Sequence, residues 1–269
     1  MCRITHGPTS RRQRKWDHLP VLGNRPFGLR SPIVRSFLNA FSVLLLILGC
    51  RADQLNVHPP DELDIALWQA EALFQSGAYD RAEPIDRWLV SKFKRKEGED
   101  SLVVALLIQN LAEVVRRTRR VRAHKEAQDL QEEALRIAVR HNSRQARLVE
   151  AIVLHHQAQF LLDLEFRMLR REGNDFVRGT GKLNIAEQKE RRALGLMEAH
   201  RELDELLVGN SLEVLSTIVA LRHEWAEAEI LKRRALAICQ RRLGSRHPRT
   251  KRVTDELASL VQRKAPGHL

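Results

Sequence analysis

The sequence predicts an all-α protein, an α-solenoid in which helical hairpins stack one after another. Glycine and proline contribute only 13 and 9 of the 269 residues, too few for an all-β chain with a turn about every ten residues. From Leu63 onward apolar residues recur at helical spacing, and no segment sustains an alternation with a period of two. Apolar residues make up 43% of the chain and charged residues 30%, a composition that suits amphipathic helices.

Polar segments divide the region 63–264 into its predicted helices. Breaks are predicted at Gly77, residues 96–100, residues 173–181, Gly209 with Asn210, and residues 244–248. One helix between these breaks is predicted over residues 148–164. A last helix, over residues 250–264, is expected to cover the end of the stack.

An internal repeat supports the stacking. In each unit a small residue is followed, seven positions later on the same helix, by alanine or leucine. The four pairs are Ala82 with Leu89, Ala127 with Ala134, Ala186 with Ala193, and Ala228 with Ala235. Their first members lie 45, 59 and 42 residues apart, about the length of one helical hairpin. Alanine at such a position lets two helices approach closely, so these residues are expected to be buried.

The last unit carries the clearest motif. It reads Trp-Ala-Glu-Ala-Glu from Trp225 and Arg-Ala-Leu-Ala-Ile up to Ile238, followed by Leu-Gly at residues 243–244 and His-Pro at residues 247–248. This pattern resembles the long tetratricopeptide repeat of kinesin light chains. The resemblance covers most of residues 63–264 and implies a tetratricopeptide-like solenoid.

The other units match this pattern to different degrees. Tyr79 begins the same helix motif in the first unit, and Asn110 begins Asn-Leu-Ala-Glu-Val, which resembles a first helix. In the second unit His124 stands at the aromatic position, and the third unit, residues 146–196, matches poorly because it contains an insertion.

The resemblance implies binding without catalysis. In such solenoids the first helix of each unit lines a groove that receives a peptide or helix of another protein. The candidate groove residues are Asn110, Glu113, Arg117, His156 and Arg222. We expect a protein or peptide partner, and neither a cofactor nor a metal ion.

A short apolar segment precedes the repeat. Residues 36–50 follow Arg35 and are too short for a membrane-spanning helix, which needs about 20 residues, but suit a signal peptide. The segment ends in Ile-Leu-Gly-Cys at Cys50, which resembles the lipobox of bacterial lipoproteins. The resemblance implies acylation of Cys50, for example with palmitate, and a lipid-anchored place in the bacterial cell envelope, facing the periplasm or the exterior. The alternative is a buried helix or weak membrane anchor with an incidental cysteine.

The chain therefore divides into five predicted parts. A lipoprotein signal peptide is predicted over residues 34–49, a tether over 50–62, the repeat domain over 63–264 and a tail over 265–269. Residues 1–33 are too polar and proline-interrupted for a signal peptide, and we interpret them as an extension that a translation start near Val34 would omit.

The basic charge is a poor argument for a nucleic-acid partner. The formal net charge is +12, but residues 1–50 hold eight basic side chains and one acidic one. Arginine pairs recur along the helices, and they either neutralise phosphates or lie on solvated faces with partners such as Glu229 for Arg233. The low aromatic content of 5% favours the second interpretation, although residues 116–122 also suit an acidic partner or anionic lipid. The rival function is a soluble regulatory or nucleic-acid-associated helical protein.

No residue set indicates an enzyme. Residues 179–182, Gly-Thr-Gly-Lys, follow no strand and lack the first glycine and the final serine or threonine of a phosphate-binding loop. His155 and His156 point about 100° apart on a helix and cannot bind one metal ion, so we expect one buried and one exposed imidazole. A hydrolase is not supported, because no coherent set of nucleophile and base is present.

Overall fold

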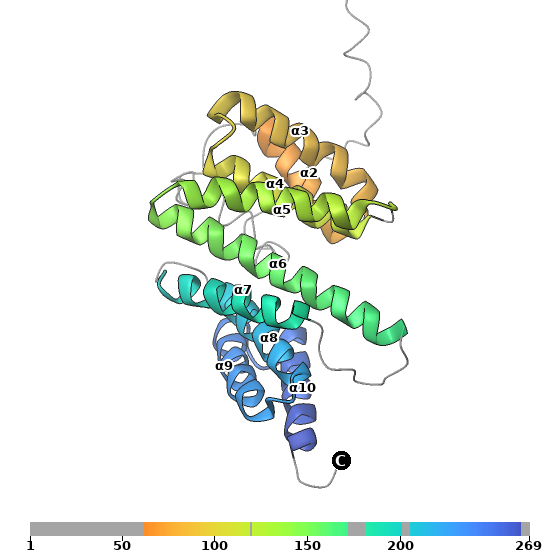
Figure 1. Ribbon diagram of the computed structural model, residues 1–269, viewed down its shortest axis with the longest axis vertical. Coiled ribbons are helices and arrows are strands. Elements are labelled where there is room, and N and C mark those ends of the chain that lie inside the picture. The colour runs from red at the N-terminus through yellow and green to blue at the C-terminus, as the bar shows by residue number, and fades with distance from the viewer. Residues whose placement is uncertain (1–61, 119, 172–180, 201–204, 265–269) are drawn as a thin grey trace, which may run out of the picture. The chain divides into compact units, whose positions relative to one another are not determined.

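The computed structural model describes residues 62–118, 120–171, 181–200 and 205–264. All of them belong to the second of two compact units of the chain, residues 37–269 (Figure 1). These described residues form nine helices and no strand. The helices are α2 (Glu62–Gln75), α3 (Tyr79–Glu97), α4 (Leu102–Arg117), α5 (Ala123–Arg140), α6 (Arg144–Arg171), α7 (Gly181–Glu198), α8 (Glu205–Leu221), α9 (Trp225–Leu243) and α10 (Pro248–Lys264).

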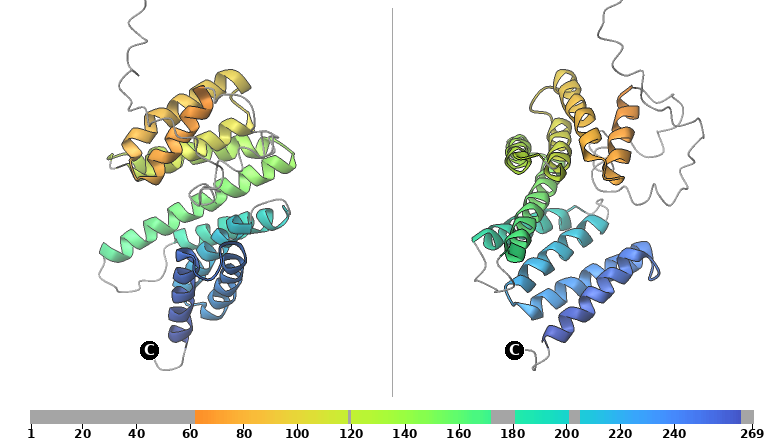
Figure 2. Two further views of the ribbon diagram at one scale, coloured as in Figure 1. Left: turned by 180° about the vertical axis from the view of Figure 1, so that it is seen from behind. Right: turned by 90° about the vertical axis from the view of Figure 1, so that its right-hand side faces the viewer.

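The helices pack in chain order as hairpins, which confirms the predicted α-solenoid. Each helix contacts the next one along the chain, and the strongest contacts include those within the hairpins α4/α5, α6/α7 and α8/α9. The first helices of successive hairpins also meet, because α4 contacts α6 and α6 contacts α8. Figure 2 shows this succession, with α10 following the fourth hairpin.

The residues that define the repeat are fully buried. All eight have 0% of their surface exposed: Ala82, Leu89, Ala127, Ala134, Ala186, Ala193, Ala228 and Ala235. The seven-residue pattern read from the sequence therefore marks the buried stripe of each second helix, as predicted.

Three of the five predicted breaks coincide with turns and one is wrong, while the break at residues 173–181 lies outside the described residues up to Gly181, where α7 begins. Gly77 lies in the turn between α2 and α3, and α3 ends one residue before Gly98. Gly209 and Asn210, by contrast, lie inside α8. A Cβ on Gly209 would stand 3.3 Å from Cγ2 of Ile238 on α9, so this glycine permits close packing of two helices rather than ending one.

The predicted N-terminal features and the tail lie outside the described residues. These are the extension 1–33, the signal peptide 34–49, Cys50 with the tether up to residue 61, and residues 265–269. Among the helices of the described ranges, none combines the length and the apolar character needed to cross a bilayer.

Candidate functional site

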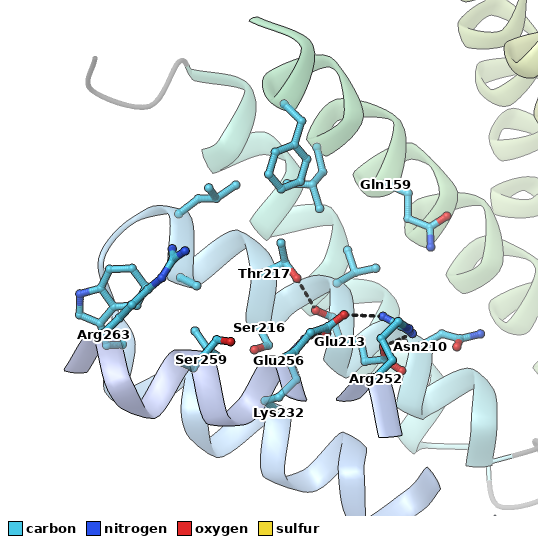
Figure 3. A pocket seen from close by; sticks show the side chains of 17 residues that line it. Gln159, Asn210, Glu213, Ser216, Thr217, Lys232, Arg252, Glu256, Ser259 and Arg263 are labelled. Carbon is cyan, nitrogen blue, oxygen red and sulfur yellow. Dashed lines mark hydrogen bonds and ion pairs between the residues drawn. The ribbon is translucent and has the colours of Figure 1, made fainter. Parts of the chain in front are cut away.

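A pocket opens between the first helices at the C-terminal end of the repeat. It has a volume of about 570 Å³, and we call it the α6–α8–α10 pocket. Its 17 lining residues are Gln159, Leu162 and Phe166 of α6, Asn210, Glu213, Val214, Ser216, Thr217, Ala220 and Leu221 of α8, Trp225 and Lys232 of α9, and Arg252, Glu256, Ser259, Leu260 and Arg263 of α10 (Figure 3).

The walls of this pocket are largely apolar. Phe166, with 40% of its surface exposed, contributes from α6, while Val214 and Leu260 face the pocket from α8 and α10. Trp225 adds an aromatic ring at the start of α9. Apolar walls with a few placed polar groups are the common character of sites that bind side chains of a partner.

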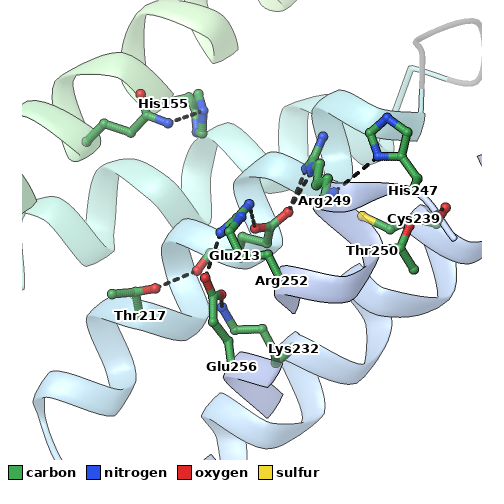
Figure 4. Close-up of polar contacts among 11 residues, drawn as sticks. His155, Glu213, Thr217, Lys232, Cys239, His247, Arg249, Thr250, Arg252 and Glu256 are labelled. Atoms are coloured by element: carbon green, nitrogen blue, oxygen red, sulfur yellow. Dashed lines mark hydrogen bonds and ion pairs between the residues drawn. The ribbon is translucent and has the colours of Figure 1, made fainter. Parts of the chain in front are cut away.

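A chain of five charged groups crosses the same pocket from α8 to α10. Glu213 accepts hydrogen bonds from Arg249 at 2.6 Å and from Arg252 at 2.8 Å. Arg252 also binds Glu256 at 2.7 Å, and Glu256 accepts a further hydrogen bond from Lys232 at 2.8 Å. Figure 4 shows Glu213 between Arg249 and Arg252, with Glu256 next to Lys232.

The ion pairs favour the charged forms of Glu256 and Arg252. Burial raises the pKa of Glu256, but Lys232 and Arg252 outweigh it and hold the pKa below the usual value. Burial lowers the pKa of Arg252, but Glu213 and Glu256 outweigh burial and hold the pKa above its usual value. Lys232 is only 3% exposed, so its ion pair with Glu256 compensates for the loss of water around the ammonium group.

The first helices α4, α6 and α8 can be aligned through one small buried residue in each. Ala112 on α4, Ala158 on α6 and Ser216 on α8 are small, have 0% exposure and occupy equivalent positions. The candidate Glu113 follows Ala112 directly, as the pocket residue Thr217 follows Ser216.

The alignment of Ala112, Ala158 and Ser216 also gives the positions on α8 that are equivalent to three other candidates. Asn110 and His156 both correspond to Val214, and Arg117 corresponds to Leu221. Val214 and Leu221 line the pocket, but none of the five predicted groove residues does so. The candidates on α6 and α4 thus occupy the positions of these α8 residues in the hairpins one and two places before α8.

Three candidates lie near one another on α4 and α6. Glu113 accepts hydrogen bonds from Arg116 at 2.6 Å and from Arg117 at 2.8 Å. Burial raises the pKa of Glu113, but Arg116, His156 and Arg117 together outweigh it and lower the pKa to about 2. His156 lies close enough for Glu113 to act on it, yet burial and His155 lower the pKa of His156 to about 4.

Arg222 lies apart from this group, in the turn after α8. Its guanidinium binds Glu187 of α7 and Glu224 of the same turn. Arg222 therefore links a second helix to the turn, and the structure does not bring it to the other candidates. Asn110 is partly buried on α4.

Serine, histidine and glutamate also meet in the core, without forming a nucleophile. His155 Nδ1 lies 2.8 Å from Glu190 Oε1, and the hydroxyl of Ser211 donates to the same carboxylate oxygen. A catalytic serine must donate to the imidazole, which in turn must reach a substrate. Here Ser211 and Glu190 have 0% exposure and His155 only 5%, so the network is internal. His155 is buried, as expected, but His156 is only partly exposed, so the expected exposed imidazole is not found.

Lys232, Arg252 and Glu256 are site residues that were not predicted from the sequence. Each belongs to a helix rich in arginine and glutamate, where charged residues ordinarily mark a solvated face. A usable signal was the position of Lys232, four residues after Ala228 on the buried stripe of α9. Within the described ranges no cluster of three histidine, cysteine or acidic residues is arranged to hold a metal ion.

Comparison with known proteins gives no relative from which to assign this site. No protein-family model matches the chain, and no curated protein matches its sequence.

Proposed function

We propose that the protein is a membrane-tethered scaffold that binds a peptide segment of another protein in the α6–α8–α10 pocket. The observation that supports this proposal is the pocket itself. It spans α6, α8 and α10, and it combines apolar walls with a row of ion-paired side chains. A surface of this kind suits a helix or an extended segment that inserts alternate side chains.

The charges of the pocket favour an acidic peptide. Its lining contains three cations, Lys232, Arg252 and Arg263, against the two carboxylates of Glu213 and Glu256. Glu213 is shared with Arg249, which increases the positive excess. The partner we propose carries a bulky apolar residue next to an acidic one.

The ion pairs of the helices do not favour the nucleic-acid alternative. Members of the arginine pairs bind carboxylates of neighbouring helices, as Arg191 binds Glu227 at 2.7 Å and Arg234 binds Glu198 at 2.5 Å. Arginine that is already neutralised gains less from a phosphate backbone than free arginine does.

Peptide display on the purified full chain tests the binding proposal. Selected peptides are expected to contain an apolar and an acidic residue, and Thr217→Trp, which fills the pocket, is expected to weaken their binding about tenfold or more. Thr254→Trp is the matched control, because both threonine hydroxyls donate to the carbonyl four residues earlier, at 2.9 Å, while Thr254 does not line the pocket. Equal affinity of the selected peptides for Thr217→Trp and the wild type would contradict the proposal.

Metabolic labelling with palmitate tests the membrane tether separately. We expect label on the wild-type chain and none on Cys50→Ala. An unlabelled wild-type chain would favour the soluble alternative and would leave the peptide proposal standing.

A further inference from the structure

A second pocket lies where α4 ends and α5 begins, and it shares no lining residue with the α6–α8–α10 pocket. It has a volume of about 530 Å³ and receives residues from α3, α4, α5 and α6. Four arginines, Arg116, Arg117, Arg120 and Arg167, and one carboxylate, Asp163, are among its lining residues. We call it the arginine pocket.

Three of these arginines have carboxylate partners. Arg116 binds Glu113 and Asp163, and Arg117 shares Glu113 with it. Arg117 is held further by the hydroxyl of Tyr79, to which its Nη1 donates at 3.2 Å.

Arg120 belongs to a neighbouring set of charges. Its guanidinium lies 2.9 Å from Glu83 and 3.2 Å from Glu126, and both carboxylates also bind Arg87. These two arginines and two glutamates neutralise one another. Nearly half of the Arg120 side chain, 46%, nevertheless remains exposed to solvent at the pocket.

Arg167 differs from the other three arginines because its contact is with a histidine. Its Nη1 lies 2.7 Å from Nε2 of His124, at the end of an imidazole that packs edge-on against Phe160. A guanidinium only donates, so Nε2 of His124 accepts and the imidazole is neutral. Burial, then Arg167 and Arg116, lower the pKa of His124, in agreement with this state. His124 therefore orients Arg167 without neutralising its charge.

Counted over the residues that the structure describes, the cluster therefore lacks one negative charge. Five arginines, including Arg87, face the four carboxylates of Glu83, Glu113, Glu126 and Asp163, and the positive charge that remains belongs to Arg167. The pocket also includes the first turn of α5, whose N-cap residue Arg122 supplies no side-chain cap. The partial positive charge of that turn adds to the field of the arginines.

We propose that the arginine pocket binds a phosphate group, carried by a small molecule or by the headgroup of an anionic lipid. Arg117, Arg120 and Arg167 approach from the end of α4, the following turn and α6. Donors that converge from different elements suit a tetrahedral phosphate, whereas a planar carboxylate is satisfied by one guanidinium fork. This site is separate from the α6–α8–α10 pocket and does not depend on peptide binding there.

Two probes test the proposal on the full chain: inorganic phosphate, measured by calorimetry at low ionic strength, and vesicles of phosphatidylglycerol compared with vesicles of phosphatidylcholine. All proteins carry Cys50→Ala, so that an acyl chain does not contribute to vesicle binding. Arg167→Gln is expected to weaken binding of the effective probe about tenfold, because it removes the uncompensated charge and a charge-assisted hydrogen bond. Arg233→Gln is the control, since Arg233 is exposed and paired with Glu229 on α9, outside the pocket.

The two arms distinguish the source of the phosphate. Binding of free phosphate that Arg167→Gln weakens supports a small phosphorylated ligand, and binding confined to phosphatidylglycerol vesicles with the same sensitivity supports a lipid headgroup. The proposal is overturned if neither probe binds, or if Arg233→Gln weakens binding as much as Arg167→Gln does.

Discussion

The first and fourth hairpins have the same turns although 146 residues separate them. Gly77 in the α2/α3 turn and His223 in the α8/α9 turn both have positive φ, 76° and 63°. The N–H of the next residue donates to the carbonyl of Leu73 at 2.9 Å and of Val219 at 3.0 Å. α3 and α9 each have 19 residues, and each ends at a glycine with φ close to 90°.

The two hairpins differ in how they join the helix that follows. At the fourth hairpin, Glu213, Arg249 and Arg252 connect α8 to α10 through ion pairs. The residues 146 positions earlier are apolar: they are Leu67, Val103 and Leu106. Val103 and Leu106 are 5% and 1% exposed and belong to the main hydrophobic core.

The buried ionisable residue of the second helix also differs between the two hairpins: it is a base in α9 and an acid in α3. Lys232 on α9 binds Glu256, whereas the equivalent residue on α3 is Asp86 and the equivalent of Glu256 is Asn110. The contact between a hairpin and the helix that follows it is here called a joint. One backbone arrangement therefore supports either an apolar joint, as at the first hairpin, or an ionic joint, as at the fourth. A pocket opens at the ionic joint, where long charged side chains keep contact with water.

The largest expected effect comes from moving a charge into the apolar joint. Leu106→Arg buries a guanidinium with no carboxylate partner, and we expect it to lower the free energy of unfolding by about 4 to 5 kcal/mol or to prevent folding. The reverse change, Arg252→Leu, leaves Glu213 with Arg249 and Glu256 with Lys232, and its expected cost is below about 1 kcal/mol. Urea unfolding of both variants measures the difference, and equal losses would show that the two joints are not distinct.

Asp86 gives a pH-dependent test of the same contrast. Burial, then Glu71 and Glu83, raise its pKa from 3.8 to about 7. Between these values the folded state holds a proton that the unfolded state releases, so stability falls as the pH rises from about 4 to about 7. Asp86→Asn removes this penalty and is expected to stabilise the protein by about 2 to 4 kcal/mol at about pH 8, with little effect at about pH 4. Thermal unfolding across this range is the measurement, and Asp80→Asn, an exposed acid of the same helix, is the control. A gain that does not depend on pH would be inconsistent with a buried ionisable carboxyl.

The shared geometry of the two hairpins predicts equal losses at their alanines. Ala82→Leu and Ala228→Leu each force a larger side chain between helices at a position with 0% exposure, and each is expected to cost about 1 to 3 kcal/mol. Ala226→Leu, at an exposed position of α9, is expected to be neutral. Denaturant unfolding of the three variants checks this, and a clear inequality between the first two would show that the hairpins pack differently.

The fold could be predicted from the sequence because the buried residues of each second helix recur with a spacing of seven, which is two helical turns. The spacing from Ala82 to Leu89, and its three counterparts, records where two helices meet, and this depends on local geometry alone. The break expected at Gly209 failed because glycine serves two purposes, and close approach to Ile238 is a tertiary fact that composition does not reveal.

The pocket was less accessible to sequence reasoning for a similar reason. Glu213 pairs with Arg249 and Lys232 with Glu256, 36 and 24 residues away. Such partners are chosen by the packing of one hairpin on the next helix, so arginine and glutamate on an amphipathic helix look alike whether they join helices or face solvent. None of the five residues predicted for the groove lines this pocket, and the charged residues that do line it could be placed only from the tertiary structure.

The smallest expected effect concerns the turns, where the hairpins differ in residue type but not in shape. A Cβ on Gly77 would meet nothing within 4 Å, so Gly77→Ala costs only the positive φ, about 1 kcal/mol. His223→Gly relieves the same strain at the equivalent position, but it also removes the edge-on contact between His223 and Trp225, whose rings lie 5.4 Å apart. We therefore expect the stability that His223→Gly gains to be smaller than the stability that Gly77→Ala loses. Urea unfolding of both variants measures the two changes. A loss of stability in His223→Gly would mean that the ring contact outweighs the backbone, and that the fourth hairpin keeps its turn through side-chain packing where the first relies on glycine.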